Sequence, residues 1–241
     1  MDSFEINDIQ SFLNLKNSFL DDDEIWYRGQ NNIDWELVPS FLRLKDSGEL
    51  AEKSLFDIFV QNSSTLINNQ INTFDWMFIM QHYGIPTRLL DWTENPLVAL
   101  YFAVETDSKE DGALWILKPK MLNKKALGFS TIPMYEDDSV IEHMKGRSQY
   151  RKRPAAILAS RNNSRIQIQE GVFTIHINND ENIDSDSKDY LLKIRIPAES
   201  KKLISSQLKL LGINKFRLFP ELSNIKDIME HKKLLEKKDS K

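Results

Sequence analysis

The sequence predicts an α+β protein in which helices come first and a mostly antiparallel sheet follows. In the first half, apolar residues recur at helical spacing. In the second half, several segments rich in β-branched and alternating apolar residues follow one another. Because 241 residues with 41% hydrophobic side chains suffice for one large core, we expect a single domain over residues 1–241.

The N-terminal part is expected to hold three helices and one short strand. The apolar and aromatic residues 25–27 predict a strand that stops at Arg28 and Gly29. Gly84 suits the left-handed position that ends a helix. The helices are predicted over residues 6–19, 48–67 and 73–83.

The middle of the chain carries a strong helix start. Residues 87–91 are expected to be extended, and Asn95 followed by Pro96 matches a side-chain cap and a first helical residue. The following residues 97–105 are apolar almost all round, so this helix is predicted to be buried.

The second half supplies the remaining strands and the closing helices. The polar residues 178–189 are expected to form a mobile surface loop, and residues 229–241 a solvated helix end. Strands are predicted over residues 112–118, 155–160, 171–177 and 190–196, and helices over residues 198–211 and 220–233.

The composition of the chain argues against several classes of function. A net charge of −4 argues against a general nucleic-acid binder, and the absence of Cys excludes disulfides and thiolate chemistry. The acidic N-terminus lacks the pattern of a signal peptide, and no apolar stretch is long enough to span a membrane. We therefore expect a cytoplasmic protein without a membrane partner.

Several chemical classes lack their motifs. The four histidines, at positions 82, 143, 176 and 231, show no paired ligand spacing, so no metal cofactor is predicted. The serine hydrolase, Walker A and G-x-G-x-x-G patterns are also missing.

Arg28 is the first candidate binding residue. It ends an apolar strand beside a glycine, and its planar donor fork suits a phosphate or a carboxylate. The alternative interpretation is a surface ion pair with one of the acidic residues 21–24.

A second candidate site is the polar cluster just before the buried helix, formed by Gln81, His82, Arg88, Asp91 and Thr93. Polar groups buried there must be satisfied by one another or by a ligand. The alternative is an Arg88–Asp91 ion pair that locks the turn, with Thr93 or Asn95 capping the helix.

Residues 151–165 form a basic stretch that could contact nucleic-acid phosphates. A solvated basic face is the alternative interpretation.

Five segments together resemble the FRG domain family. They are "WYRGQ", "W.L.PS..R", "QHYGIPTRLLDWTENPLVALYFA", "RIQIQEGVFTIH" and "LGINKFRLFPEL", and they extend over about residues 24–228. The N-terminal helix, within residues 1–23, precedes these motifs. Tyr27 stands at the aromatic position of the aromatic-Arg-Gly motif.

The same motifs resemble, more remotely, those of ADP-ribosyltransferases. "WYRG" is similar to the strand that binds NAD. "LLDWTENPLVALYFA" is similar to the Ser-Thr-Ser strand and the helix after it, with Thr93 near the Ser-Thr-Ser position. Gln167, Gln169 and Glu170 occupy the region of the catalytic Glu. The resemblance implies a related sheet, Arg28, Thr93 and Gln169 as catalytic residues, and further NAD-binding residues Tyr27, Gly29, Gln30, His82, Tyr83, Arg88, Asp91, Trp92 and Tyr101.

The function implied is that of a glycosyltransferase that takes NAD as a substrate, without a metal, and transfers ADP-ribose to a macromolecular acceptor, a protein or a nucleic acid. Such a protein could serve as a toxin or as a phage-defence effector. Two alternatives stay open. One is a non-catalytic nucleotide-binding or protein-interaction module, and the other is a nucleic-acid-binding protein that uses residues 147–165.

Overall fold

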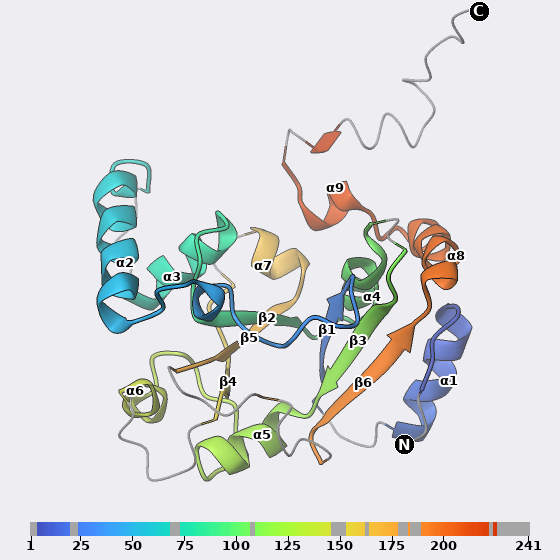
Figure 1. The fold of residues 1–241 in the computed structure, drawn as a ribbon, viewed down its shortest axis with the longest axis horizontal. Helices are drawn as coiled ribbons and strands as arrows, with labels where there is room; N and C mark the ends of the chain where they lie inside the picture. Colours follow the sequence, from blue (N-terminus) through green and yellow to red (C-terminus); the bar gives the residue numbers. More distant parts are fainter. Residues whose placement is uncertain are drawn as a thin grey trace, which may run out of the picture.

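A computed structural model describes residues 4–19, 24–67, 73–106, 109–145, 153–161, 164–177, 183, 189–221 and 224–225. In these parts of the chain, one twisted antiparallel sheet is packed between helices (Figure 1). The predicted α+β class is confirmed.

Over the described ranges, the sheet has six strands in the order β4-β5-β2-β1-β3-β6, and all neighbouring strands run antiparallel. The strands are β1 (Trp26–Gln30), β2 (Leu89–Thr93), β3 (Gly112–Leu117), β4 (Ala155–Ile157), β5 (Gly171–Ile175) and β6 (Leu191–Ile196).

The two central strands are joined at a single point. β1 pairs with β3 along its whole length, and β2 pairs likewise with β5, whereas β1 and β2 share only the register pair Tyr27 and Thr93. The sheet is therefore two three-stranded halves that part between β1 and β2.

The helices are α1 (Ile9–Phe19), α2 (Glu49–Ser63), α3 (Thr73–His82), α4 (Pro96–Val104), α5 (Pro119–Ala126), α6 (Asp138–Met144), α7 (Ser164–Ile168), α8 (Ala198–Leu210) and α9 (Lys215–Leu218), with a 3₁₀ turn at Phe41–Arg43. Within the described residues, none of them combines the length and the apolar character needed to cross a bilayer.

Helix α4 lies directly on the backbone of the sheet. A Cβ atom at Gly29 of β1 would lie 1.8 Å from the carbonyl oxygen of Ala99, and one at Gly112 of β3 would lie 2.7 Å from that of Ala103. Only glycine permits so close an approach. This contact explains why α4 is apolar all round, because its other side packs on α8.

In the part of the chain that the structure describes, three apolar clusters form the core. One lies between β1, β3 and β6 and helices α1, α4 and α8, and the second covers the opposite face around Trp26, Trp92 and Trp115. The third joins the β2, β4 and β5 half to α3, α5, α6 and α7. Each half of the sheet thus has its own helical cover.

Among the described residues, the predicted elements are present with shifted ends. The first strand does not stop at Arg28 and Gly29 as predicted but continues to Gln30, because both residues pair with β3. Helix α1 begins at Ile9 because Ile6 donates its N–H to the carbonyl of Arg195 at 2.9 Å, which ties that residue to the edge of β6. β4 stops at Ile157.

The short helices α5, α6, α7 and α9 were not predicted, although Pro119 at the start of α5 and the Asp137 cap of α6 are recognised start signals. The predicted helix over residues 220–233 and the predicted loop over residues 178–189 lie mostly outside the described residues.

Candidate functional site

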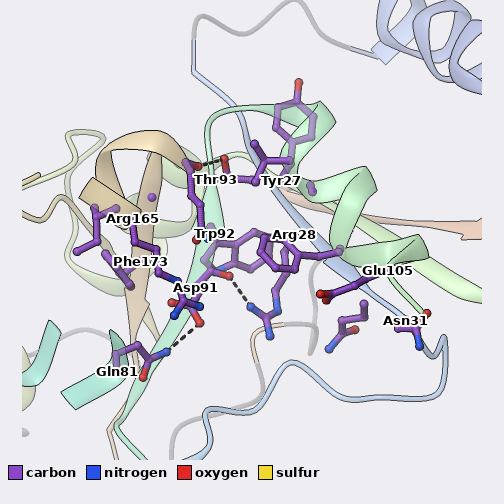
Figure 2. Close-up of a pocket in the computed structure, with 18 of the residues that line it drawn as sticks. Tyr27, Arg28, Asn31, Gln81, Asp91, Trp92, Thr93, Glu105, Arg165 and Phe173 are labelled. Carbon is purple, nitrogen blue, oxygen red and sulfur yellow. Dashed lines mark hydrogen bonds between the residues drawn. The ribbon is translucent and has the colours of Figure 1, made fainter. Parts of the chain in front are cut away.

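A cavity of about 370 Å³ lies where β1 and β2 part (Figure 2). Its volume falls in the range of small-molecule sites, about 300 to 1,000 Å³. Its apolar walls come from Tyr27, Trp35, Phe78, Trp92, Val98, Ala99, Phe102, Ile166 and Phe173. Its polar lining is formed by Arg28, Gln30, Asn31, Gln81, His82, Asp91, Thr93, Glu105, Thr106, Arg165 and Gln169.

Arg28 lies in this cavity with unused hydrogen-bonding capacity. Its Nη1 donates to the main-chain oxygen of Asp91 at 2.6 Å, across the gap between the strands (Figure 2). Its Nε is buried and meets no acceptor among the described residues. Burial lowers the pKa of Arg28, an effect that Asp91 opposes and Arg43 reinforces. A buried donor without an acceptor is costly, so this geometry suits an anionic ligand.

The surface ion pair considered for Arg28 is not formed with Glu24. Glu24 instead lies 3.4 Å from Lys120. Residues 21–23 lie outside the described part of the chain.

Asp91 presents a carboxylate to the cavity. The strand pattern of β2 buries every residue except Asp91. Its Oδ2 accepts a hydrogen bond of 2.8 Å from Nε2 of Gln81 on α3 (Figure 2). Gln81 is held in turn by Thr87, whose hydroxyl donates to the Gln81 Oε1. Of the polar cluster found in the sequence, Gln81 and Asp91 are thus bonded to each other, whereas Arg88 and Thr93 have other partners.

Thr93 and Gln169 are brought together, but through structural hydrogen bonds. The Thr93 hydroxyl donates to the Gln169 carbonyl at 2.6 Å and accepts from the Asn95 N–H at 3.0 Å. Nε2 of Gln169 donates to the carbonyl of Leu218 at 3.1 Å. Both residues line the cavity, and their bonds fasten α4, α7 and α9 around it.

Glu170 has another role than the one its position suggests. Its carboxylate accepts from Nδ2 of Asn95 at 2.9 Å, while Asn95 Oδ1 caps α4 by accepting from the Leu97 N–H. Glu170 has a φ of 47° and is not among the cavity-lining residues. Its carboxylate therefore orients the helix cap.

His82 and Arg165 form a further wall. Nη1 of Arg165 donates to the His82 carbonyl at 3.1 Å, and its guanidinium lies 4.6 Å from the centre of the Phe219 ring. Burial lowers the pKa of His82, Arg165 lowers it further, and Glu221 opposes both. The His82 ring is therefore mainly neutral at pH 7.

Three predicted ligand-binding residues lie outside the cavity. The buried Arg88 forms an ion pair with the partly exposed Glu52 of α2 and not with Asp91, so the pair considered from the sequence is replaced by a longer-range one. Tyr83 is 69% exposed, and Tyr101 packs toward the cluster beneath α8. Gln30 lines the cavity, but its side chain bonds Trp115 and the Glu36 carbonyl.

Sequence reasoning missed several cavity residues. Phe102 extends the face of α4 that carries Val98 and Ala99, and Phe173 lies in the middle of β5, four positions after Gln169. Arg165 stands four positions before Gln169, the spacing of one helical face. This spacing was the sequence signal that could have identified Arg165 as a cavity residue.

The basic stretch is used within the fold as far as it is described. Arg153 is buried and donates to the Tyr190 hydroxyl at 3.1 Å, and Arg161 pairs with Glu94. Residues 146–152 and 162–163 lie outside the described part. No cluster of three or more His, Asp or Glu that could hold a metal occurs in the residues with described positions.

A sequence model of the FRG domain matches residues 23–112 of the chain. This range includes β1, β2 and α4, the elements that carry Arg28, Asp91 and Phe102. Comparison with curated proteins and with solved structures gave no match.

Proposed function

We propose that this protein, an FRG domain protein, binds NAD in the cavity between β1 and β2 and transfers ADP-ribose to a macromolecule. The observation that carries the proposal is the convergence of Arg28 with the segment around Thr93. The two residues are separated by more than sixty positions in the chain and line one cavity.

The reaction breaks the bond between C1′ of the ribose and the nicotinamide nitrogen. The bonding electron pair leaves with nicotinamide, positive charge develops at C1′, and an acceptor oxygen or nitrogen forms the new bond and loses a proton. With water as the acceptor, the products are ADP-ribose, nicotinamide and a proton. A site for this chemistry needs donors for the pyrophosphate, an apolar wall and an electron-rich group near the ribose.

The cavity contains side chains suited to each need. The buried, unpaired Nε of Arg28 can donate to a phosphate oxygen. Trp92, Phe102 and Phe173 supply an apolar surface against which a flat ring can stack. Gln169 lies at the ribose or at the acceptor in this proposal, with Thr93 holding its main chain.

The acceptor is a protein or a nucleic acid, and the biological role is that of a toxin or a phage-defence effector acting in the cytoplasm. A cell lysate is therefore the appropriate source of acceptors. Metal ions have no role in this scheme.

The proposal is tested by incubating the protein with labelled NAD and a cell lysate, and by measuring NAD binding by calorimetry. We expect labelled product and binding, both abolished in Arg28→Ala. The matched control is Arg161→Ala, because Arg161 pairs with Glu94 at the surface and does not line the cavity. Absence of both labelled product and NAD binding would overturn the proposal.

One observation favours a second candidate, a nucleotide-binding module without transfer activity. At the third motif Gln169 is neutral, and the carboxylate of Glu170 is occupied by Asn95. Such a module would show an increase in melting temperature with NAD, because a ligand that binds only the folded state stabilises it, but no cleavage of NAD.

A further inference from the structure

We propose that Asp91 is the carboxylate that acts on the ribose of the bound nucleotide, and that Gln81 and Thr87 are its positioning residues. This inference rests on the proposed function and names the electron-rich group that Gln169 and Glu170 do not provide.

The position of Asp91 is unusual within its strand. Leu89, Leu90, Trp92 and Thr93 are all buried, whereas Asp91 is exposed to the cavity. A carboxylate on a central strand costs free energy unless it is solvated or bound. Its placement is therefore better explained by a ligand than by packing.

A directed chain of hydrogen bonds holds the carboxylate. The Thr87 hydroxyl accepts from the Leu89 N–H at 3.2 Å, and so donates its own proton to Oε1 of Gln81. Because Oε1 is thus the acceptor, the amide group of Gln81 must point its NH₂ at Asp91, where it donates to Oδ2 at 2.8 Å. Thr87 is buried, so this orientation is maintained without solvent.

The second oxygen of the carboxylate stays available. In the described part of the chain, no donor reaches Oδ1 of Asp91, and Arg28 bonds the main-chain oxygen of Asp91 and not its carboxylate. The guanidinium and the carboxylate therefore lie side by side without a direct hydrogen bond between them (Figure 2). A ligand in which a phosphate adjoins a ribose can contact both.

The other carboxylates are less suited. Glu170 bonds Asn95 and does not line the cavity. Glu105 follows the end of α4, on the side of Asn31 and Thr106, and lies 3.4 Å from the Tyr101 hydroxyl. Among the carboxylates in the described part of the chain, only Asp91 combines a place beside Arg28 with a fixed orientation.

The chemistry of a ribose matches this arrangement. A carboxylate accepts hydrogen bonds from the two neighbouring ribose hydroxyls, and its negative charge stabilises positive charge that develops at C1′ when nicotinamide leaves. Asp91 thus contributes to binding before the reaction and contributes more in the transition state.

The test compares Asp91→Asn with the wild-type chain in NAD binding by calorimetry and in NAD cleavage. The substitution keeps the shape and removes the charge. We expect about tenfold weaker NAD binding, and about 100-fold lower kcat with a smaller change in KM, in the range found when one stabilising group is removed. Asp91→Ser is a second variant, and melting curves check that both are folded. Asp57→Asn on the exposed face of α2 is the matched control and should behave as wild type.

The positioning residues are tested by rescue. Thr87→Val and Gln81→Met should each lower kcat by about tenfold, whereas Thr87→Ser keeps the hydroxyl and should restore most of the activity. A merely structural role would lower the melting temperature without this difference in kcat between Ser and Val.

The outcomes separate the two proposals. If Asp91→Asn binds and cleaves NAD as the wild type does, while Arg28→Ala does not, the role of Asp91 is wrong and the proposed function stands. If the wild-type chain binds NAD without cleaving it, the affinity of Asp91→Asn for NAD tests the role of Asp91. About tenfold weaker binding would support that role, and unchanged binding would contradict it. If the wild-type chain does not bind NAD, the proposed function fails and the role of Asp91 fails with it.

Discussion

Nη1 of Arg28 donates to the main-chain oxygen of Asp91 at 2.6 Å, two residues before Thr93, the one β2 residue in register with β1. The bond spans the gap that opens between the two strands, so the Arg28 side chain links β1 to β2 where main-chain pairing between them has ended. This relationship connects the two halves of the sheet at the cavity, which Arg28 lines.

Gly29→Ala should prevent stable folding. The added Cβ would lie 1.8 Å from the Ala99 carbonyl oxygen and 2.6 Å from the Ala103 nitrogen, so α4 would have to move away from β1. We expect a loss of at least about 3 kcal/mol in the free energy of unfolding. Urea denaturation measures it. Gly48→Ala is the control, because its Cβ would meet only Asp46 at 3.4 Å, and an equal loss there would contradict the explanation.

Glu52→Ala should destabilise the fold by removing the partner of a buried cation. The side chain of Arg88 is 8% exposed and that of Glu52 25% exposed. We expect a loss of about 2 kcal/mol, below the range for a fully buried pair because Glu52 is partly solvated. Glu94→Ala breaks the more exposed pair with Arg161 and should cost less than about 1 kcal/mol. Similar losses in both variants, measured by urea denaturation, would contradict the distinction.

His176 should make stability depend on pH in the acid range. Burial, followed by the charges of Arg28 and Arg88, lowers the pKa of His176 to about 3 from its usual value of 6.5. Between those values the unfolded chain binds the proton and the folded chain does not, so stability falls as pH falls below about 6.5. The contribution of this group has a slope of up to about 1.4 kcal/mol per pH unit.

His176→Gln is the variant that isolates this contribution. Glutamine can keep the hydrogen bond to the Thr174 hydroxyl, now 3.0 Å from Nε2 of His176. Urea denaturation at pH 7 and pH 5 should show a weaker pH dependence in the variant. An unchanged dependence would assign the effect to His82 and His143, whose pKa values burial also lowers.

Thr93→Val should loosen the wall of the cavity. The variant keeps the volume but leaves the Gln169 carbonyl and the Asn95 N–H without their partner. We expect a loss of about 2 kcal/mol in unfolding free energy, because two polar groups lose a hydrogen bond at a buried position. Thr93→Ser keeps the hydroxyl, and equal melting temperatures for the Ser and Val variants would show that the hydroxyl has no such role.

Most of the fold could be predicted because its signals are local. Short stretches of neighbouring residues specify the start of α4 at Asn95 and Pro96, the end of α3 near Gly84 and the apolar strands. Helices α5, α6, α7 and α9 have between four and eight residues, too few for a clear apolar period. Their positions depend on packing against the sheet.

The candidate site was predicted in part. Arg28, Asp91, Thr93 and Gln169 were recognised and lie together in the cavity. Arg88 was grouped with them because it stands beside them in the chain, yet its side chain turns toward Glu52. In extended chain, successive side chains point to opposite faces, so residues that are close in sequence can lie on different sides of the sheet.

The sequence by itself determined the class of fold, the buried helix α4 and the residues with chemistry to offer, since propensity, spacing and side-chain type are properties of short segments. Only the tertiary structure decided which of those residues share a cavity, because β1 and β2 share a single register pair, Tyr27 and Thr93, and part beyond it. It also decided that Glu170 caps a helix through Asn95 while Asp91 faces the open space. Those choices depend on contacts between segments distant in the chain, which no local pattern encodes.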